Sequence, residues 1–180
     1  MFCVILQLLI LDKALNKAAR SLFVCVFGMV LGGCASLTGG GLVPGKSVRK
    51  DVEAAMGQPA EKISSPNGDS IWFYPRHQAG RQTIAVRIAP DGTVRSVEER
   101  LEPEYMAKVV AGVTTASQAR ELLGPPYRVA HLPLLQRDVS DYLFYDGMGI
   151  KQVLSLQFSP DGVVREINVV RDPTEVSGAK

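Results

Sequence analysis

Cysteine and histidine are scarce in this chain, and their positions exclude several kinds of site. The sequence has 180 residues but only 3 cysteines, all among the first 34, so the rest can form neither a disulfide nor a thiolate metal site. The 2 histidines, His77 and His131, lie in expected loops without the spacing of zinc motifs. No serine lies in a Gly-x-Ser-x-Gly sequence, and no glycine-rich phosphate loop opens a helix. We therefore predict a non-enzymatic protein with no metal and no cofactor.

An excess of charge of one sign is also missing. The chain has 20 basic and 18 acidic residues, and these become 17 and 17 once Lys13, Lys17, Arg20 and Asp12 are set aside with residues 1–33. Nucleic-acid binding needs a clustered basic surface, which a balanced composition does not favour. The balance therefore argues against nucleic acid as a partner.

The N-terminal region has the pattern of a secretion signal. Three basic residues precede an apolar run over residues 22–31, which is too short to span a bilayer. The run ends in Leu31-Gly32-Gly33-Cys34, which resembles the lipobox of bacterial lipoproteins. This resemblance implies a signal peptide over residues 1–33, lipidation of Cys34 and a membrane anchor, followed by a flexible linker over residues 34–44. Ala35 implies the outer membrane, because lipoproteins kept in the inner membrane usually have Asp there.

A short pattern occurs twice in the remaining chain. Gly45-Lys46-Ser47 opens a stretch that closes with Gly57-Gln58-Pro59, and Gly112-Val113-Thr114 opens one that closes with Gly124-Pro125-Pro126. The two glycines that bound each stretch are 12 positions apart in both copies. Apolar residues at helical spacing lie between them, and a closing Gly-x-Pro is typical of a helix end. Each copy therefore predicts a short helix.

Hydroxyl side chains mark where these helices should begin. Ser47 and Thr114 are placed to cap them, and Thr115 with Gln118 offers a second capping possibility in the second copy. A further short helix is expected within residues 98–111.

Each helix is followed by a predicted meander of three strands. In the first copy, an aromatic strand over residues 71–74 should stop at Pro75, and alternating strands should follow over 83–88 and 93–97. The turn Pro90-Asp91-Gly92 recurs as Pro160-Asp161-Gly162. Residues 60–69 and 128–140 are expected to be loops, and the strands of the second copy are expected near 141–145, 151–158 and 163–170.

This order of elements predicts an α+β fold. We expect two tandem units, each a short helix pair or single helix packed on a three-stranded antiparallel sheet. The first unit should cover residues 45–103 and the second residues 104–172, with a flexible tail over 173–180.

These features together resemble the SmpA/OmlA/BamE family of small outer-membrane lipoproteins. The resemblance rests on the lipobox, the Gly-x-Ser/Thr helix that ends in Gly-x-Pro, the strand at Asp69–Tyr74 and the Pro-Asp-Gly turn. Tandem units of this type are also similar to the fold of β-lactamase inhibitory protein. The chain departs from the family in having two units and no Gly-Met-Thr helix start.

The resemblance implies a function in the cell envelope. It implies a non-catalytic lipoprotein that faces the periplasm and binds outer-membrane or periplasmic proteins, barrel-assembly components among them, in outer-membrane protein assembly or envelope integrity. The tandem arrangement suggests an alternative, an inhibitor or binding protein for a secreted or periplasmic hydrolase.

Aromatic and basic residues gather around the first predicted hairpin. Trp72, Phe73, Arg76 and Arg81 are the candidates for binding a partner or a lipid, because aromatic rings and Arg are enriched at interface hot spots and Arg attracts anionic lipids. Alternation along a strand sends Trp72 to one face and Phe73 to the other. Core packing beside a solvated hairpin is the other interpretation of the same residues, and the sequence leaves both open.

Overall fold

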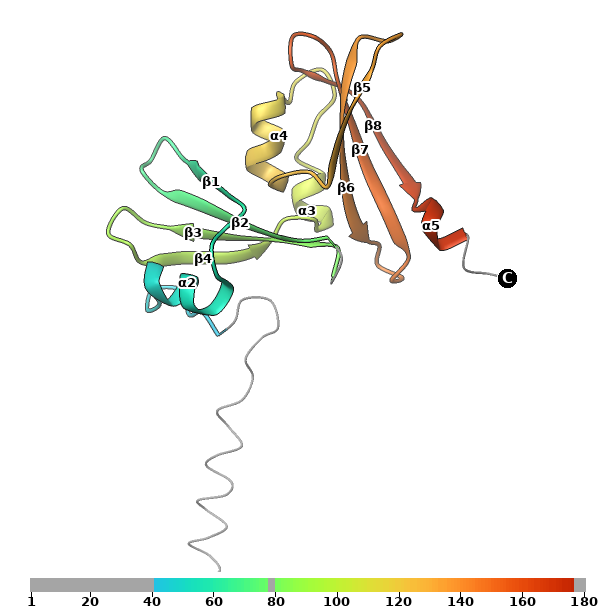
Figure 1. Ribbon diagram of the computed structural model, residues 1–180. Helices are drawn as coiled ribbons and strands as arrows, with labels where there is room; N and C mark the ends of the chain where they lie inside the picture. The colour runs from blue at the N-terminus through green and yellow to red at the C-terminus, as the bar shows by residue number, and fades with distance from the viewer. Residues whose placement is uncertain (1–40, 78–79, 177–180) are drawn as a thin grey trace, which may run out of the picture. The chain divides into compact units, whose positions relative to one another are not determined.

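The computed structural model describes residues 41–77 and 80–176 (Figure 1). The predicted signal peptide, Cys34 and most of the predicted linker lie outside the described residues. The chain divides into Met1–Ser36 and Leu37–Lys180, and the elements below all belong to the second of these units. Over the described ranges, no helix combines the length and apolar character needed to cross a membrane.

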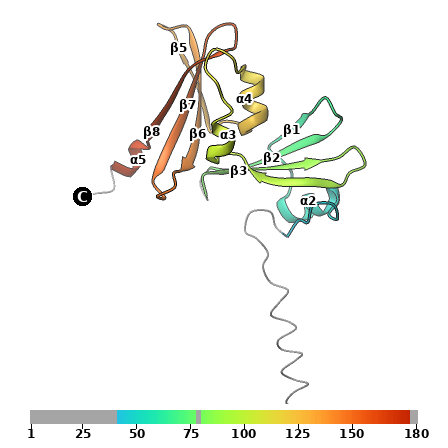
Figure 2. The same cartoon turned by 180° about the vertical axis from the view of Figure 1, so that it is seen from behind.

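Two tandem halves follow one another, each with a short helix ahead of an antiparallel meander (Figures 1 and 2). The sheets have the strand orders β1-β2-β3-β4 and β5-β6-β7-β8, so the predicted α+β fold with two tandem units is confirmed. The first half comprises α2 (Arg49–Met56), β1 (Glu61–Ser64), β2 (Ser70–Arg76), β3 (Gln82–Ile88) and β4 (Val94–Glu99). The second half comprises α3 (Pro103–Met106), α4 (Ala116–Leu123), β5 (Arg128–Leu132), β6 (Arg137–Tyr145), β7 (Lys151–Phe158), β8 (Val164–Arg171) and α5 (Pro173–Val176).

Each sheet has one strand more than the sequence predicts. Both expected loops contain an edge strand, because β1 pairs with β2 and β5 pairs with β6. The side chains of β1 alternate between half-buried and exposed, and those of β5 are exposed along most of its length. An edge strand is paired on one side only and is often polar, so a search for apolar alternation does not find it. The prediction of three strands per sheet is therefore wrong.

The first aromatic strand also runs further than predicted, because Pro75 lies within β2 and pairs with Thr83 of β3. The carbonyl of Phe73 accepts a hydrogen bond from the Ala60 N–H at 2.9 Å, so the backbone at this residue points toward β1. Pro75, two residues later, points to the same side, where β1 has already ended. Its missing N–H therefore removes no bond from the sheet.

The hydroxyl residues of the repeat have equivalent roles in the two halves, but these are not the predicted ones. Ser47 Oγ accepts a hydrogen bond from the Val43 N–H at 2.9 Å, and Thr114 Oγ1 accepts one from the Val110 N–H at 2.8 Å. Both side chains thus stabilise the turn that precedes the helix instead of capping the helix.

The N-cap residue of each helix is instead the next residue along the chain, Val48 in α2 and Thr115 in α4. In α4, Thr115 accepts from the Gln118 N–H while the Gln118 side chain accepts from the Thr115 N–H, so the second capping possibility is confirmed. In α2 this position is Val48, which has no side-chain acceptor, so only one half of the reciprocal pair forms, the bond from the Val48 N–H to the Asp51 carboxylate at 2.8 Å. The two helices start at equivalent positions with different chemistry.

Helix α4 contacts both sheets. Ala119 and Leu123 are buried in the core of the second half, against Tyr142, Leu154 and Leu156 among others. At the end of the same helix, Gly124 lies against Phe73 and Thr83 of the first sheet. The first sheet is therefore covered on one face by α2 and contacted on the other by α4.

Gly57 and Gly124 are equivalent residues that allow this contact to be tested. Both have φ near +80°, 77° and 82°, with extended ψ, a conformation essentially restricted to glycine. An added Cβ at Gly57 would meet nothing within 4 Å, whereas at Gly124 it would lie 2.7 Å from Phe73 Cδ1 and from Thr83 Cγ2.

We expect Gly57→Ala to lower the free energy of unfolding by about 1–3 kcal/mol, through backbone strain alone. Gly124→Ala should cost roughly 2 kcal/mol more, because overpacking is added to the same strain. Urea unfolding of both variants measures the difference. Equal losses would show that α4 does not press on the first sheet.

Candidate functional site

Trp72 and Phe73 lie in different layers of the first half. Trp72 is 3% exposed and lies in the core beneath α2, with Lys62 Nζ 4.0 Å and Arg49 Cζ 5.9 Å from its ring centroid. Phe73 is fully buried on the opposite face of the sheet, with Ile71. The alternation predicted from the sequence is confirmed, and it separates the two rings.

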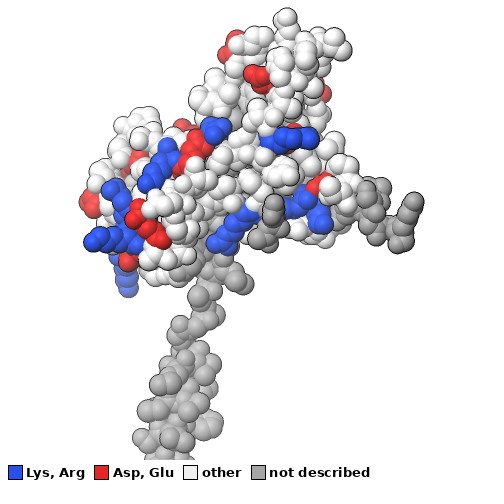
Figure 3. Space-filling view, viewed as in Figure 1, with Lys and Arg blue, Asp and Glu red and all other residues white. Residues whose placement is uncertain are grey.

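The two predicted arginines lie at the other end of β2. Arg76 is half-buried where this strand ends. Arg81 is nearly buried, forms an ion pair with Asp172 beyond β8, and has its Cζ 5.8 Å from the Tyr145 ring centroid. The four candidate residues therefore share no exposed surface, and their role in binding stays a prediction. On the face shown in Figure 3, basic and acidic side chains are interspersed.

The histidines pair with neighbours in the second half. His77 contacts Tyr127 edge to face with ring centroids 5.3 Å apart, and burial lowers its pKa. His131 Nδ1 lies 2.8 Å from Asp138 Oδ1. In the part of the chain that the structure describes, no group of three or more His, Cys, Asp or Glu residues is arranged to hold a metal ion.

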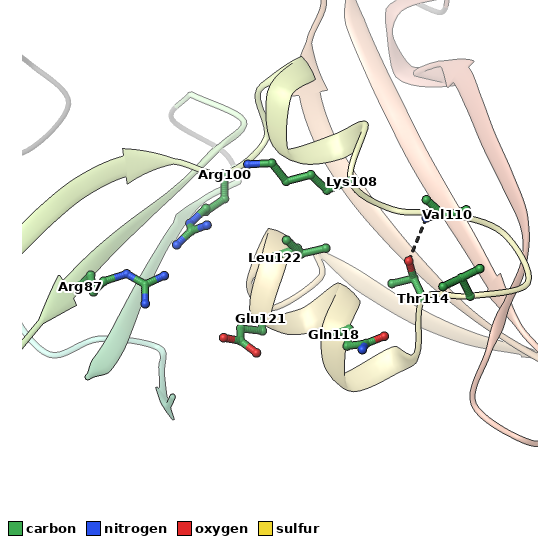
Figure 4. A pocket seen from close by; sticks show the side chains of 9 residues that line it. Arg87, Arg100, Lys108, Val110, Thr114, Gln118, Glu121 and Leu122 are labelled. Carbon is green, nitrogen blue, oxygen red and sulfur yellow. Dashed lines mark hydrogen bonds between the residues drawn. The ribbon is translucent and has the colours of Figure 1, made fainter. Parts of the chain in front are cut away.

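A cavity of about 480 Å³ lies beside α4, between this helix and residues of the first sheet (Figure 4). It is bounded by β3, by the chain that leaves β4 and by the segment that joins α3 to α4. Its lining includes three basic and three apolar side chains, Arg87, Arg100, Lys108, Val110, Val113 and Leu122.

Arg100 is the most unusual residue of this lining, because it is charged and only 3% exposed. Its Nε and one of its terminal nitrogens, Nη2, are buried without a hydrogen-bond partner. Glu98 Oε2 lies 3.0 Å from Nη2, which is close enough for an ion pair but is not aligned for a hydrogen bond. The guanidinium also lies over the Tyr105 ring, with Cζ 4.4 Å from its centroid. The Nε–Nη2 edge of Arg100 is therefore buried, and its charge is met by Glu98 and by the Tyr105 ring.

Backbone hydrogen bonds fix the position of Arg100 just beyond β4. Its own N–H donates to the Thr83 carbonyl at 2.9 Å. The carboxylate of the preceding residue, Glu99, accepts hydrogen bonds from the N–H of Thr83 at 2.8 Å and from the N–H of Leu101, the residue after Arg100, at 2.9 Å. Because the chain is held on both sides, the guanidinium is presented from a rigid base.

The charged groups of the other two basic residues of the cavity, Arg87 and Lys108, point in different directions. Arg87 is half-buried on β3, with Nη1 3.8 Å from Asp69, and its guanidinium points into the cavity in Figure 4. The ammonium of Lys108 instead lies 3.1 Å from Glu104 and 4.2 Å from the Tyr105 ring centroid. Lys108 thus contributes mainly its apolar stem, and Arg87 and Arg100 carry the positive charge of the site.

Two carboxylates lie close to these arginines. Burial disfavours ionisation of Glu98, but a hydrogen bond from the Tyr105 hydroxyl at 2.8 Å and the charges of Arg100 and Arg87 outweigh it and lower its pKa. Glu121 of α4 lines the cavity and accepts a long hydrogen bond, 3.4 Å, from Ser65. The positive charges of Arg87 and Arg100 are therefore offset at the site by the carboxylates of Glu98, Glu121 and Asp69.

Sequence reasoning did not find this site. The one available signal was Arg87, a charged residue on an otherwise apolar strand, which alternation assigns to the face opposite α2. Arg100 gave no signal, because its burial depends on how the chain folds back to place Tyr105 and α4 around it. Only the folded arrangement brings the two arginines to one cavity.

The ion pair of Asp172 with Arg81 predicts a pH dependence. A hydrogen bond from the Thr174 N–H, together with the Arg81 guanidinium, outweighs desolvation and lowers the pKa of Asp172 from 3.8 to about 2. A carboxyl whose pKa is lower in the folded state stabilises the fold above its unfolded pKa, and this is lost as the pH falls toward about 2. In urea unfolding between pH 7 and 2, Asp172→Asn should be less stable at neutral pH and should lose stability less steeply below about pH 4. Parallel curves for the two proteins would contradict this.

No family model matches the chain, and no curated protein matches it. Among solved structures, a DUF4309 family protein (YjgB) from Bacillus subtilis shares 22% identity over 73% of this chain and 83% of its own, with a TM-score of 0.28. An extracellular protein containing a SCP domain from Bacillus anthracis shares 15% identity over 79% of this chain and 48% of its own, with a TM-score of 0.30. Neither description names the SmpA/OmlA/BamE family, and at these TM-scores neither likeness informs the function of this chain.

Proposed function

We propose that this protein is a non-catalytic lipoprotein of the outer membrane that faces the periplasm and binds other envelope proteins, in outer-membrane protein assembly or envelope integrity. The lipobox that ends at Cys34 supports the anchor, and the balanced charge argues against nucleic acid. The resemblance to the SmpA/OmlA/BamE family supports the location and the kind of partner.

The observation that carries the proposed binding role is the exposed apolar surface of the second half. Leu134 is 99% exposed at the tip of the β5–β6 hairpin, Met148 is 81% exposed at the tip of the β6–β7 hairpin, and Val129 is 63% exposed on β5. Val129 and Leu134 share the β5–β6 hairpin, whereas Met148 lies at the opposite end of β6, so the β5–β6 hairpin is the candidate protein-binding region. The first half has fewer such residues, so we assign the partner surface to the second half.

The β5–β6 tip is built to present its leucine in a fixed place. The N–H of Leu135 donates to the Leu132 carbonyl at 3.2 Å, and the N–H of Gln136 donates to the Pro133 carbonyl at 3.3 Å. Gln136 has φ of 48°, which closes the turn. A tip that is already ordered loses little conformational entropy on binding, so Leu134 is suited to insertion into a partner.

The same tip favours a second candidate function, a binding protein or inhibitor for a secreted or periplasmic hydrolase. A single protruding apolar side chain on a rigid hairpin matches a concave cleft better than a flat surface. Titration against periplasmic hydrolases separates this candidate from the first, since only an inhibitor lowers their activity.

Lipidation is tested by changing Cys34. We expect Cys34→Ser to move the protein from the membrane fraction to the soluble periplasmic fraction, because each acyl CH₂ buried in the bilayer contributes about 0.8 kcal/mol. Cys25→Ser, in the predicted signal peptide, is the matched control and should leave the protein in the membrane fraction. The mass of the mature N-terminal peptide should include the acyl chains, and a Cys34→Ser protein that stays with membranes after signal removal would contradict the anchor.

The partner surface is tested by Leu134→Asp. Capture of barrel-assembly components from solubilised outer membranes should fall by about tenfold or more, since a charge at a buried interface position costs several kcal/mol. Folding should be unchanged, because the residue is fully exposed. Val48→Asp, an exposed apolar residue of the first half, is the control and should bind like the unchanged protein. Recovery of no barrel-assembly component by the unchanged protein would defeat that assignment.

A further inference from the structure

Strand β8 is an outer edge of the second sheet, and three of its exposed side chains are apolar (Figures 1 and 2). Val169 is 55% exposed, Val170 is 51% exposed and Ile167 is 37% exposed. From Ile167 to Val170 the strand has no proline and no charged side chain, the features that usually protect an edge from pairing with another chain. An apolar edge of this kind is suited to pairing with a further strand.

The backbone hydrogen bonds show which groups of β8 face away from the sheet. The N–H of Asp172 donates to the carbonyl of Lys151 of β7 at 2.9 Å, so the backbone of Asp172 points toward β7. This direction alternates from one residue to the next, and the pairing with β7 keeps one register along this part of β8. The N–H and C=O groups of Ile167, Val169 and Arg171 therefore point away from β7, to a side where the described part of the chain supplies no strand.

The equivalent edge of the first half is covered. The three corresponding residues, at the offset of 70 positions between the two Pro-Asp-Gly turns, are Val97, Glu99 and Leu101. Val97 packs against the core beneath α2, the Glu99 carboxylate accepts two backbone hydrogen bonds, and Leu101 is 4% exposed. The corresponding residues of β8 are all exposed. Folding of the single chain therefore does not account for the apolar residues on this edge.

We propose that β8 binds β8 of a second copy of this chain, antiparallel and about a two-fold axis at Val169. The outward groups are symmetric about this residue, because Ile167 lies two positions before it and Arg171 two positions after it. Val169 would pair with its equivalent, Ile167 of each copy would pair with Arg171 of the other, and each pair would exchange two hydrogen bonds. An axis one residue earlier or later would leave one of the three outward positions unpaired on each copy. The symmetric pairing joins the two sheets into one continuous sheet.

The side chains that this pairing brings together are compatible. On one face, the two Val169 side chains would meet at the axis, and Ile167 would lie beside the apolar stem of Arg171. On the other face, Val170 would lie beside Asn168 of the other copy. The pairing thus covers all three exposed apolar side chains of the edge, which adds hydrophobic stabilisation to the backbone hydrogen bonds.

The carboxylates at the ends of the pairing are neutralised within their own chain. Glu166 would lie opposite Asp172 of the other copy. Glu166 forms an ion pair with Arg137 at 2.9 Å, and Asp172 forms one with Arg81. Repulsion between these two acidic residues is therefore weak and does not oppose the joining of two copies.

This surface is separate from the proposed partner surface, and the inference does not rest on the proposed function. The β5–β6 hairpin lies at the opposite edge of the same sheet, so it stays free in both copies. A pair of chains would present two such hairpins, and a partner with two binding sites would be held more tightly than by one chain.

Amide hydrogen exchange of the full chain in mild detergent tests the proposal without a substitution. The N–H groups of Ile167, Val169 and Arg171 should exchange about tenfold more slowly at about 100 μM protein than at about 1 μM, because pairing with a second copy depends on concentration. The N–H of Leu134, at the tip of the β5–β6 hairpin, is the control and should exchange at the same rate at both concentrations. Exchange of the three β8 amides that does not change with concentration would overturn the inference.

Charge substitutions at Val169 locate the axis. Two full-length copies with different tags are expressed together, and capture of one tag measures recovery of the other copy. Val169→Asp in both copies, or Val169→Lys in both copies, should lower this recovery by about fivefold or more, because like charges would face each other at the axis. Val169→Asp in one copy with Val169→Lys in the other should restore it. The same substitutions at Met148, which is 81% exposed at the β6–β7 tip, are the matched control and should leave recovery unchanged.

The outcomes separate this inference from the proposed function. No recovery of the second copy of the unchanged chain would overturn the inference, and so would a mixed pair of Val169 variants that recovers no better than the like-charged pairs. A monomeric chain that captures barrel-assembly components defeats the inference and leaves the proposed function in place. Paired chains that capture none of these components support the inference and count against that assignment.

Discussion

The contact of α4 with the first sheet is the constraint on which the rest of this structure depends. The helix buries Ala119 and Leu123 in its own half, and its terminal glycine lies against Phe73 and Thr83 of the other half. Arg120 adds hydrogen bonds of 2.7 and 2.9 Å to Glu61, and these raise the pKa of its guanidinium. One short helix thus serves two sheets, and only glycine allows the approach at its end.

This shared helix explains why a repeated sequence gives two unequal halves. The glycine that ends α2 has open space around it, whereas its equivalent in α4 has none. The first sheet is accordingly buried on both faces along β2, where Ile71 to Tyr74 are all buried. The second half keeps apolar side chains exposed on its hairpins and edge strands, where no second helix covers them. Duplication supplied two similar units, and the use of one helix by both left the second unit with the surface available for a partner.

The repeat, the helix ends and the central strands could be predicted from the sequence, because glycine, proline and Asp-Gly turns restrict the backbone locally. The edge strands could not be predicted. The pairing of β1 and β5 is satisfied by backbone bonds to one neighbour, and none of their side chains is fully buried. Nor could the sequence assign Ser47 and Thr114 to the turn before the helix, since a hydroxyl one residue earlier fits the capping pattern equally well. The candidate cavity could not be predicted from the sequence, because Arg100 is buried only once Tyr105 and α4 pack around it.

The cavity lies beside the contacts that α4 makes with the first half through Arg120, Glu121 and Gly124. Near its last turn the helix is in contact with the sheet through Gly124, while along Gln118, Glu121 and Leu122 the space between helix and sheet stays open. Arg87 and Arg100 lie on the sheet side of that opening, where water is partly excluded and a charge-assisted hydrogen bond is stronger than at a free surface. The same contact that holds the two halves together therefore sets the width of the site and the burial of its arginine.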